Sequence, residues 1–434
     1  MSNARLLLVM LLCASPAVLF FDGPIMHGLV AGVAALGLAA VSRAMRPGET
    51  EFLLSFARSA TLLAAIPALW MLIQVLPLGL FAHPIWASTE AAIGHSVMGT
   101  ISIDIGASVM ALGQYLTIAA IGLWSAAVAV DRQRAEWILF ALMAATALIG
   151  LALLTMKFFG VASLDSGNAS FEEMQAIDCV ALGIIIAAAA GIRTLERYET
   201  RHASPHRSVA VLWCTFAACA GAIALCAVAL IVEARDATLI AAAFGVIALV
   251  AVVCIRRLGL GTWGILAIAL PVVGIAAFLV AENPGLRTNS FALAFTVESP
   301  ASVISMTQRI LDDAPLPGTG AGTFAAIAPV YRDSEDRTVV STGPTAAATV
   351  AVELGRPMFW LIVATMAGSI YVLLRASLRR GRDSFYPMAG AGCLVTLLFL
   401  CFMNPGALGT AAATITAAVL GLAVAQSRSR TVQQ

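Results

Sequence analysis

The residues best suited to chemistry lie in one polar segment, residues 282–349, which interrupts a chain otherwise rich in apolar runs. At 315–324 this segment reads Pro-Leu-Pro-Gly-Thr-Gly-Ala-Gly-Thr-Phe. Gly318, Gly320 and Gly322 permit tight turns that expose backbone N–H groups, and a row of such groups can bind phosphate. No Lys-Ser/Thr pair follows and no strand is expected before the motif, so it is neither a P-loop nor a dinucleotide fingerprint. A purely structural turn is the alternative interpretation.

Two helices are expected beside this motif. Residues 301–313 have helical spacing without a breaker, so one face should pack on the protein and Arg309 should face water. The positions expected to pack are Val303, Ile304, Met306, Ile310 and Leu311. Residues 343–356 can form a short helix with Pro344 near its start. Glu353 and Arg356 would then lie three residues apart at the membrane interface, where they could form an ion pair.

Histidine and cysteine offer weaker candidates. His83 and His95 fall in an earlier polar stretch, residues 82–106, and each could be a catalytic base or simply a polar surface residue. The eight cysteines all lie in or beside apolar runs, and none has C-x-x-C spacing. We therefore expect neither a disulfide framework nor a metal site.

The composition defines what must hold these residues in place. Apolar residues make up 60% of the chain and charged residues 11%, with a mean hydropathy of +0.94. Ordinary soluble domains carry about 25% charge, so the sequence predicts a polytopic membrane protein in contact with the lipid bilayer. Backbone polar groups must be satisfied within each span, which favours an all-α transmembrane helix bundle. A net charge of +1 does not indicate a nucleic-acid partner.

About twelve runs are long and apolar enough to cross a bilayer. The predicted spans are 5–21, 26–43, 59–81, 106–130, 137–157, 178–193, 208–232, 238–255, 259–281, 350–374, 386–403 and 406–425. They divide the chain into an N-terminal membrane region (1–281), a large loop between spans nine and ten (282–349) and a C-terminal membrane region with a short tail (350–434). The first run could instead be a cleaved secretory signal.

Basic residues predict the orientation of these spans. With both termini cytoplasmic, most of the 25 Lys and Arg residues face inward, and the 282–349 loop lies outside, in the periplasm. Charged residues are scarce within the spans, and Arg58, Asp104 and Asp178 fall at their predicted ends. This scarcity argues against a proton-coupled transporter or a pore. Gln74 and Gln114 are expected to form hydrogen bonds between helices.

The order of these features resembles that of the O-antigen ligase and O-antigen polymerase superfamily of bacterial envelope glycosyltransferases. Members have ten to fourteen spans and one large periplasmic loop late in the chain. The specific similarity covers roughly residues 300–370, with Ile-Ser-Ile-Asp at 101–104 similar to the family's first periplasmic loop. The matching loop positions are Pro315, Gly318, Gly320, Gly322, Phe324, Tyr331, Glu353 and Gly355.

The resemblance implies a protein of the bacterial inner membrane that transfers or polymerises a glycan from an undecaprenyl-diphosphate donor. The acceptor would be a glycan or a lipid, and the inverting chemistry would require no metal or other cofactor. Arginine forks suit the diphosphate leaving group. The candidate ligands are Arg287, Arg309, Arg332, Arg337 and Arg356, together with the motif glycines.

The chain departs from the family at the catalytic base. The family histidine corresponds to Pro344, and residues 282–349 contain no histidine. Glu353 is the candidate base or orienting carboxylate, with Asp333, Glu335 and His83 as alternatives. A non-catalytic relative that binds lipid-linked glycan or pathway partners, and a transporter related to polysaccharide export, remain alternative functions.

Overall fold

The structure is a computed structural model. It describes residues 2–21, 23–79, 82–96, 98–159, 169–199, 209–233, 236–258, 291–293, 295, 299–332, 342–380 and 383–427. These described parts are helical and contain no strand. The predicted all-α class is therefore confirmed for this part of the chain.

Nine of the described helices are long and apolar enough to cross a membrane. They are α3 (Pro24–Ala44), α4 (Pro47–Val75), α6 (Ile105–Val128), α7 (Arg132–Phe159), α8 (Ala169–Glu199), α9 (Val209–Glu233), α10 (Asp236–Leu258), α15 (Arg356–Arg379) and α16 (Phe385–Met403). Shorter apolar helices lie at the two ends of the chain: α1 (Ser2–Cys13), α2 (Ser15–Phe20) and α17 (Thr410–Ala425). These apolar helices indicate that the chain is a membrane protein.

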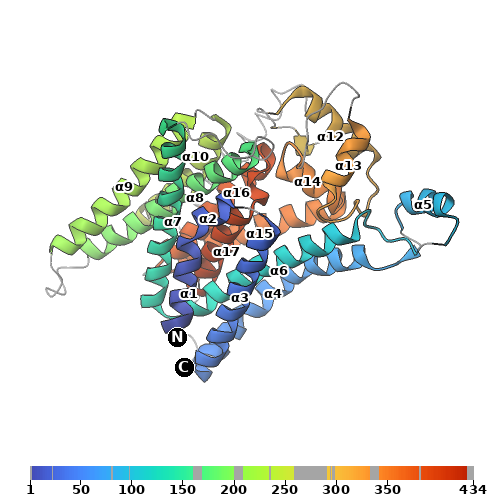
Figure 1. Ribbon diagram of the computed structural model, residues 1–434. Helices are drawn as coiled ribbons and strands as arrows, with labels where there is room; N and C mark the ends of the chain where they lie inside the picture. The colour runs from blue at the N-terminus through green and yellow to red at the C-terminus, as the bar shows by residue number, and fades with distance from the viewer. Residues whose placement is uncertain are drawn as a thin grey trace.

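Helices α8, α16 and α17 form the centre of the bundle (Figure 1). Helix α8 is the most enclosed of the candidate spans, with 78% of its apolar window buried. Small residues allow the close approach of these helices, as expected in membranes. A Cβ on Gly392 of α16 would lie 2.9 Å from the Ile185 side chain of α8. By contrast, only 11% of the corresponding windows of α4 and α6 is buried, so these two helices present long apolar faces.

Most predicted spans coincide with a helix, but several differ in their bounds, and the predicted span 5–21 is divided into α1 and α2. Helix α8 begins nine residues before the predicted start at 178, because the polar stretch 169–177 continues the same helix. The predicted span 350–374 corresponds to α15, but its predicted start is wrong, since the chain breaks at Gly355, whose φ of 86° ends one helix before α15 begins. The predicted span 259–281 lies outside the described residues.

The longer α8 changes the environment of one acidic residue. Asp178 lies inside the span Phe171–Glu196 and has no exposed surface, so its predicted place at a span end is wrong. Its Oδ1 accepts a 2.9 Å hydrogen bond from Asn404 Nδ2, in the turn between α16 and α17. Asp104 does lie at a helix end, where its side chain accepts from Ala107 N and caps α6.

The large loop contributes three short helices above one side of the bundle (Figure 1). They are α12 (Ala301–Asp313), α13 (Phe324–Tyr331) and α14 (Ala346–Glu353), preceded by the single turn η4 (Phe291–Leu293). The predicted helix 301–313 is confirmed, and Met306, Ile310 and Leu311 are buried as expected. They pack with Phe324 and Val352 in a second apolar core, separate from that of the bundle. Helix α14 crosses the predicted boundary at 349/350.

Candidate functional site

The Gly-rich motif folds as a compact series of turns between α12 and α13. Gly318, Gly320 and Gly322 have φ values of 85°, 111° and 74°, a region that side chains rarely adopt. At Gly320 an added Cβ would also lie 2.8 Å from the Cα of Ser102. Both the backbone angle and the close neighbour therefore require glycine at this position.

The backbone amides of the motif bind the end of α14. Thr319 N donates to Val352 O and Gly320 N donates to Glu353 O, each at 3.0 Å, while Gly318 N donates to Pro315 O at 2.9 Å. Carbonyl groups in the last turn of a helix have no intrahelical donor, so the bonds from Thr319 and Gly320 satisfy α14 at its C-terminus. The amides of Gly318 and Gly320 thus have acceptors within the protein, and their predicted binding of phosphate stays a prediction.

Gln74 joins this motif to α4. It has no exposed surface, and its Nε2 donates to Pro317 O and Glu353 O, each at 2.9 Å. Its Oε1 accepts from Ala321 N at 3.2 Å. One side chain therefore binds three separate points of the motif and of α14. The predicted helix-to-helix hydrogen bonds are confirmed, since Gln74 of α4 bonds Glu353 of α14 and Gln114 Nε2 contacts Nδ1 of His27 on α3 at 2.6 Å.

The segment 99–103 before α6 forms the other side of the motif. Ser102 N donates to Gln74 O at 3.0 Å, and Ile103 N donates to Thr319 O at 2.9 Å. Ser108 Oγ of α6 donates to Ala321 O at 2.8 Å. The Ile-Ser-Ile-Asp stretch and the Gly-rich motif, singled out separately in the sequence, are thus direct neighbours.

Glu353 presents its carboxyl group to the start of α13. Its Oε1 accepts a 3.1 Å hydrogen bond from Phe324 N, and the residue as a whole is half-buried. Burial raises the pKa of Glu353 to about 7, and backbone hydrogen bonds from Gly322 and Phe324 oppose that rise. A carboxyl group with this pKa exchanges its proton near neutral pH, which suits a general base or acid.

The predicted ion pair between Glu353 and Arg356 is wrong. Gly355 turns the chain between them, so they do not share one helix, and Glu353 bonds Phe324 instead. Arg356 is exposed at the start of α15, and its Nη2 donates to Leu311 O at 2.7 Å. That carbonyl belongs to the last turn of α12, where a positive charge is favourable.

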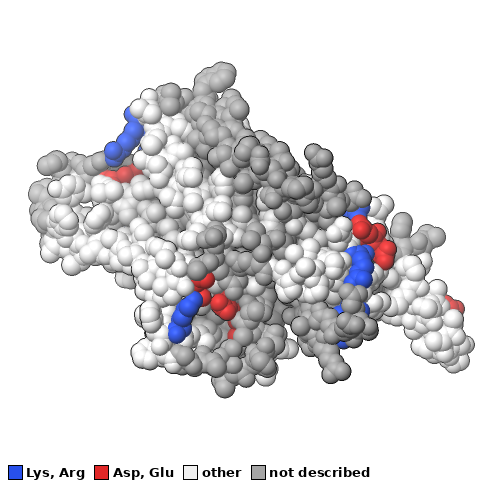
Figure 2. All heavy atoms as spheres, turned by 90° about the horizontal axis from the view of Figure 1, so that it is seen from above, with Lys and Arg blue, Asp and Glu red and all other residues white. Residues whose placement is uncertain are grey.

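Two further candidate arginines lie around α13. Arg309 is exposed on α12, as predicted, and its Nη2 donates to Tyr331 O at the end of α13, at 2.9 Å. Arg332 follows directly and is also exposed. Burial raises the pKa of Tyr331, and a hydrogen bond with Asp313 raises it further. Figure 2 shows basic and acidic side chains next to each other over this end of the molecule.

Of the remaining candidate site residues, the structure describes only the two histidines. Arg287, Arg337, Asp333 and Glu335 lie outside the described residues. His83 accepts a 3.2 Å bond from Ile85 N at Nδ1, and burial lowers the pKa of its ring. His95 is exposed. Among the described residues, no three His, Cys, Asp or Glu side chains gather as a metal site would require.

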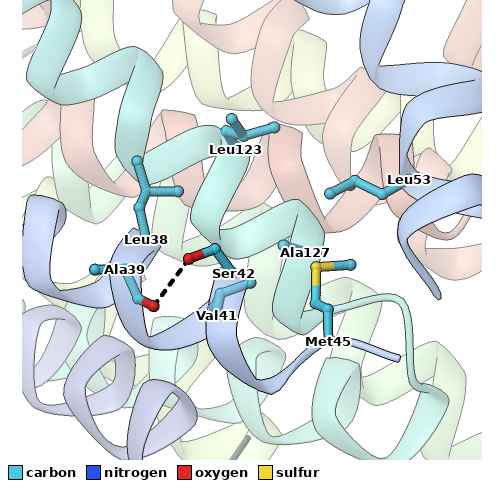
Figure 3. A pocket seen from close by; sticks show the side chains of 8 residues that line it. All are labelled: Leu38, Ala39, Val41, Ser42, Met45, Leu53, Leu123 and Ala127. Atoms are coloured by element: carbon cyan, nitrogen blue, oxygen red, sulfur yellow. Dashed lines mark hydrogen bonds between the residues drawn. The ribbon is translucent and has the colours of Figure 1, made fainter. Parts of the chain in front are cut away.

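A cavity of about 340 Å³ lies between α3, α4 and α6, and its lining carries no charged or catalytic side chain (Figure 3). Its lining is Leu38, Ala39, Val41, Ser42, Met45, Leu53, Leu123 and Ala127. The hydroxyl of Ser42 already donates to Ala39 O at 3.0 Å. Leu53 and Gln74 are separated by about 30 Å along α4, at 1.5 Å per residue. The cavity is therefore distant from the Gly-rich motif.

Sequence reasoning missed the contribution of Gln74 and Ser102, because each lies more than two hundred residues from its partners in the motif. The one available signal was a polar residue within an apolar helix. The comparisons add no relative from which roles could be transferred, since no family model and no curated protein matches this sequence.

Proposed function

We propose that this protein is an O-antigen ligase-like or polymerase-like glycan transferase of surface polysaccharide assembly. In this proposal it transfers glycan from undecaprenyl diphosphate on the periplasmic side of the bacterial inner membrane, with both termini in the cytoplasm. Glu353 removes the proton from the acceptor hydroxyl. The acceptor oxygen attacks the anomeric carbon, and the bond to the diphosphate breaks with inversion.

The environment of Glu353 is the observation that carries this proposal. A general base needs a pKa near the working pH and access to a proton on the substrate. The pKa of about 7 and the partial exposure of Glu353 meet both conditions. The amides of Gly322 and Phe324 hold the carboxyl group in place, so the motif orients the base.

Arg356 is the described candidate for the diphosphate that is nearest to Glu353 along the chain. A guanidinium has five N–H donors, so the bond to Leu311 O leaves Arg356 with donors for phosphate oxygens. It stands three residues beyond Glu353 in the chain. Arg309 and Arg332 lie together at the end of α13 and supply further positive charge.

A non-catalytic relative that binds lipid-linked glycan is the second candidate. Arg309 and Arg356 each donate to a carbonyl at a helix end, which is a structural use of a guanidinium. In this function the same arginines would bind the diphosphate without any group transfer.

Complementation of a deletion strain tests the proposal. Glu353→Gln should abolish display of surface polysaccharide, because an amide cannot accept the proton, and Arg356→Ala should reduce it severalfold. Asp312→Asn on exposed α12 and Arg379→Ala at the far end of α15 are the matched controls and should restore display. Each variant must be present in the membrane at the wild-type level.

Full display with Glu353→Gln would exclude Glu353 as the base. If Glu353→Gln retains display while Arg356→Ala loses it, the non-catalytic candidate is favoured. Unchanged surface and lipid-linked glycan on deletion of the whole chain would remove both candidates, and the transporter alternative would move forward.

A further inference from the structure

Helix α5 (Ile85–Ile93) projects away from the rest of the molecule. It lies beyond the ends of α4 and α6 and is clear of the bundle (Figure 1). None of its residues is buried. A nine-residue helix with no buried residue is marginal in water, so this helix needs a surface to lie on.

The surface of α5 is apolar and almost without charge. Ile93 is 59% exposed, and Met98, just beyond the helix, is 81% exposed. Ile85, Thr89, Ala92 and Ile93 have the spacing of one helix face. The hydroxyls of Ser88 and Thr89 both donate to Ile85 O at 2.8 Å, so they add little polarity. Glu90 is the one charged residue of the helix.

The helix is attached to two helices that face lipid. Both α4 and α6 cross the candidate membrane region with little of their surface buried, and α5 lies where they end. No Lys or Arg occurs between Arg58 and Arg132, so nothing in this region attracts an acidic partner. Trp86, a residue type enriched at membrane interfaces, donates through Nε1 to Ser102 O at 3.1 Å.

We propose that α5 binds the lipid surface, lying along the bilayer with Ile85 and Ile93 among the upper acyl chains. Such a position buries an apolar helix face by about 5–10 Å. The lipid contact continues that of α4 and α6, and it accounts for a helix of which no residue is buried by the protein.

This contact would extend to the Gly-rich motif. Trp86 bonds Ser102 O, and Ser102 packs against Gly320. His83 N, just before α5, donates to Thr100 O at 2.9 Å. Through this segment the lipid-bound helix holds one side of the motif at the level of the membrane surface.

Spin labels on the two faces of α5 test this inference. A nitroxide is placed at Ile93→Cys or at Ala91→Cys, which lies on the opposite face and is equally part of the helix. The exposed native cysteines, Cys13, Cys214 and Cys254, are replaced by alanine, and a sample without added cysteine gives the background. The full chain is studied in nanodiscs of phosphatidylethanolamine and phosphatidylglycerol by power saturation.

At position 93 the ratio of collisions with oxygen to collisions with a water-soluble nickel chelate should be severalfold higher than at position 91. Equal access of nickel to both positions would place α5 in water and overturn the inference. An immobile label at 93 that neither reagent reaches would mean protein contact, which also overturns it.

A pair of charge variants gives a second readout that does not depend on labels. Ile93→Asp should raise the rate of proteolysis within residues 82–96 in the same nanodiscs, because a carboxylate is costly among acyl chains. Ala91→Asp should leave that rate unchanged. Equal effects of both variants would count against a lipid-facing Ile93.

Discussion

At the scale of the residue, the carboxyl group of Glu353 is subject to two opposing effects. Burial favours its neutral form, whereas the N–H groups of Gly322 and Phe324 favour its charge. Burial prevails, and the pKa rises from 4.5 to about 7. The same balance that makes Glu353 a possible base should also appear in the stability of the folded protein.

Stability should therefore fall as the pH rises through the pKa of Glu353. Below about pH 4.5 the carboxyl is protonated in both the folded and the unfolded state. Between about pH 4.5 and 7 the unfolded chain ionises first, and a stabilisation of the order of 3 kcal/mol is lost. Thermal unfolding in detergent across this range should show the loss in the wild type and a smaller slope in Glu353→Gln. Identical slopes would contradict the raised pKa.

Gly320→Ala should destabilise the protein, because both the φ of 111° and the nearby Ser102 disfavour a side chain. A strained backbone of this kind costs about 1–3 kcal/mol, before any displacement of Ser102. Gly113→Ala on α6 is the control, since nothing lies within 4 Å of an added Cβ there. The unfolding midpoint should drop for Gly320→Ala alone. An equal midpoint for both variants would mean that the turn adapts readily.

At the scale of the element, the site is a junction between helices that end near one another. Helix α14 ends at Glu353, and its last carbonyls accept from the Gly-rich motif and from α4. Trp70 of α4 adds a 2.9 Å bond from Nε1 to Leu354 O. Each element supplies what its neighbour lacks, since helix ends leave carbonyls unpaired and tight turns leave amides unpaired.

Gln74→Leu should separate α4 from this junction. It removes three hydrogen bonds and leaves buried backbone groups unpaired, at a cost of about 2–4 kcal/mol. Trp70→Phe removes a single bond and should cost about 1 kcal/mol. Unfolding of both variants under the same conditions gives the comparison. Equal losses would show that Gln74 is not the main link.

Asp178 forms a comparable joint between α8 and the turn that follows α16. Asn404 donates to Asp178 through its side chain, and its backbone carbonyl accepts from Ala346 N of α14 at 3.0 Å. Asp178→Leu should cost about 1–3 kcal/mol by leaving the Asn404 amide unpaired. Asp178→Asn keeps an acceptor and should unfold nearer to the wild type. The reverse order would show that the negative charge itself matters.

At the scale of the whole molecule, an apolar bundle carries a small second core formed by α12, α13, α14 and the start of α15. Hydrogen bonds from Gln74 of α4 and Ser108 of α6 join the motif, and with it this second core, to the bundle. A polar loop of this size could not order itself without burying apolar residues of its own, which explains Phe324 and Val352.

The orientation of the bundle can be measured with reporters. Alkaline phosphatase inserted between residues 333 and 341 should be active if this segment lies in the periplasm, as the distribution of Arg predicts. The same enzyme fused after Gln434 should be inactive, and a fluorescent protein there should fluoresce. Active phosphatase at the C-terminus would show that the span count or the orientation is wrong.

The sequence by itself determined the local features of this protein. Long apolar runs predicted the helices, and the spacing within 301–313 predicted both α12 and its buried face. These features follow from neighbouring residues, because a helix needs only its own backbone bonds and a periodic apolar side. The glycines of the motif likewise predicted a turn.

Only the tertiary structure decided how these parts form a site. In the folded protein Gln74 forms hydrogen bonds with residues more than two hundred positions away. Glu353 accepts a hydrogen bond from the amide of Phe324 instead of pairing with Arg356, and Asp178 is buried. A pattern of types and spacings cannot give these results, because a hydrogen bond or a raised pKa depends on which distant groups exclude water and supply partners.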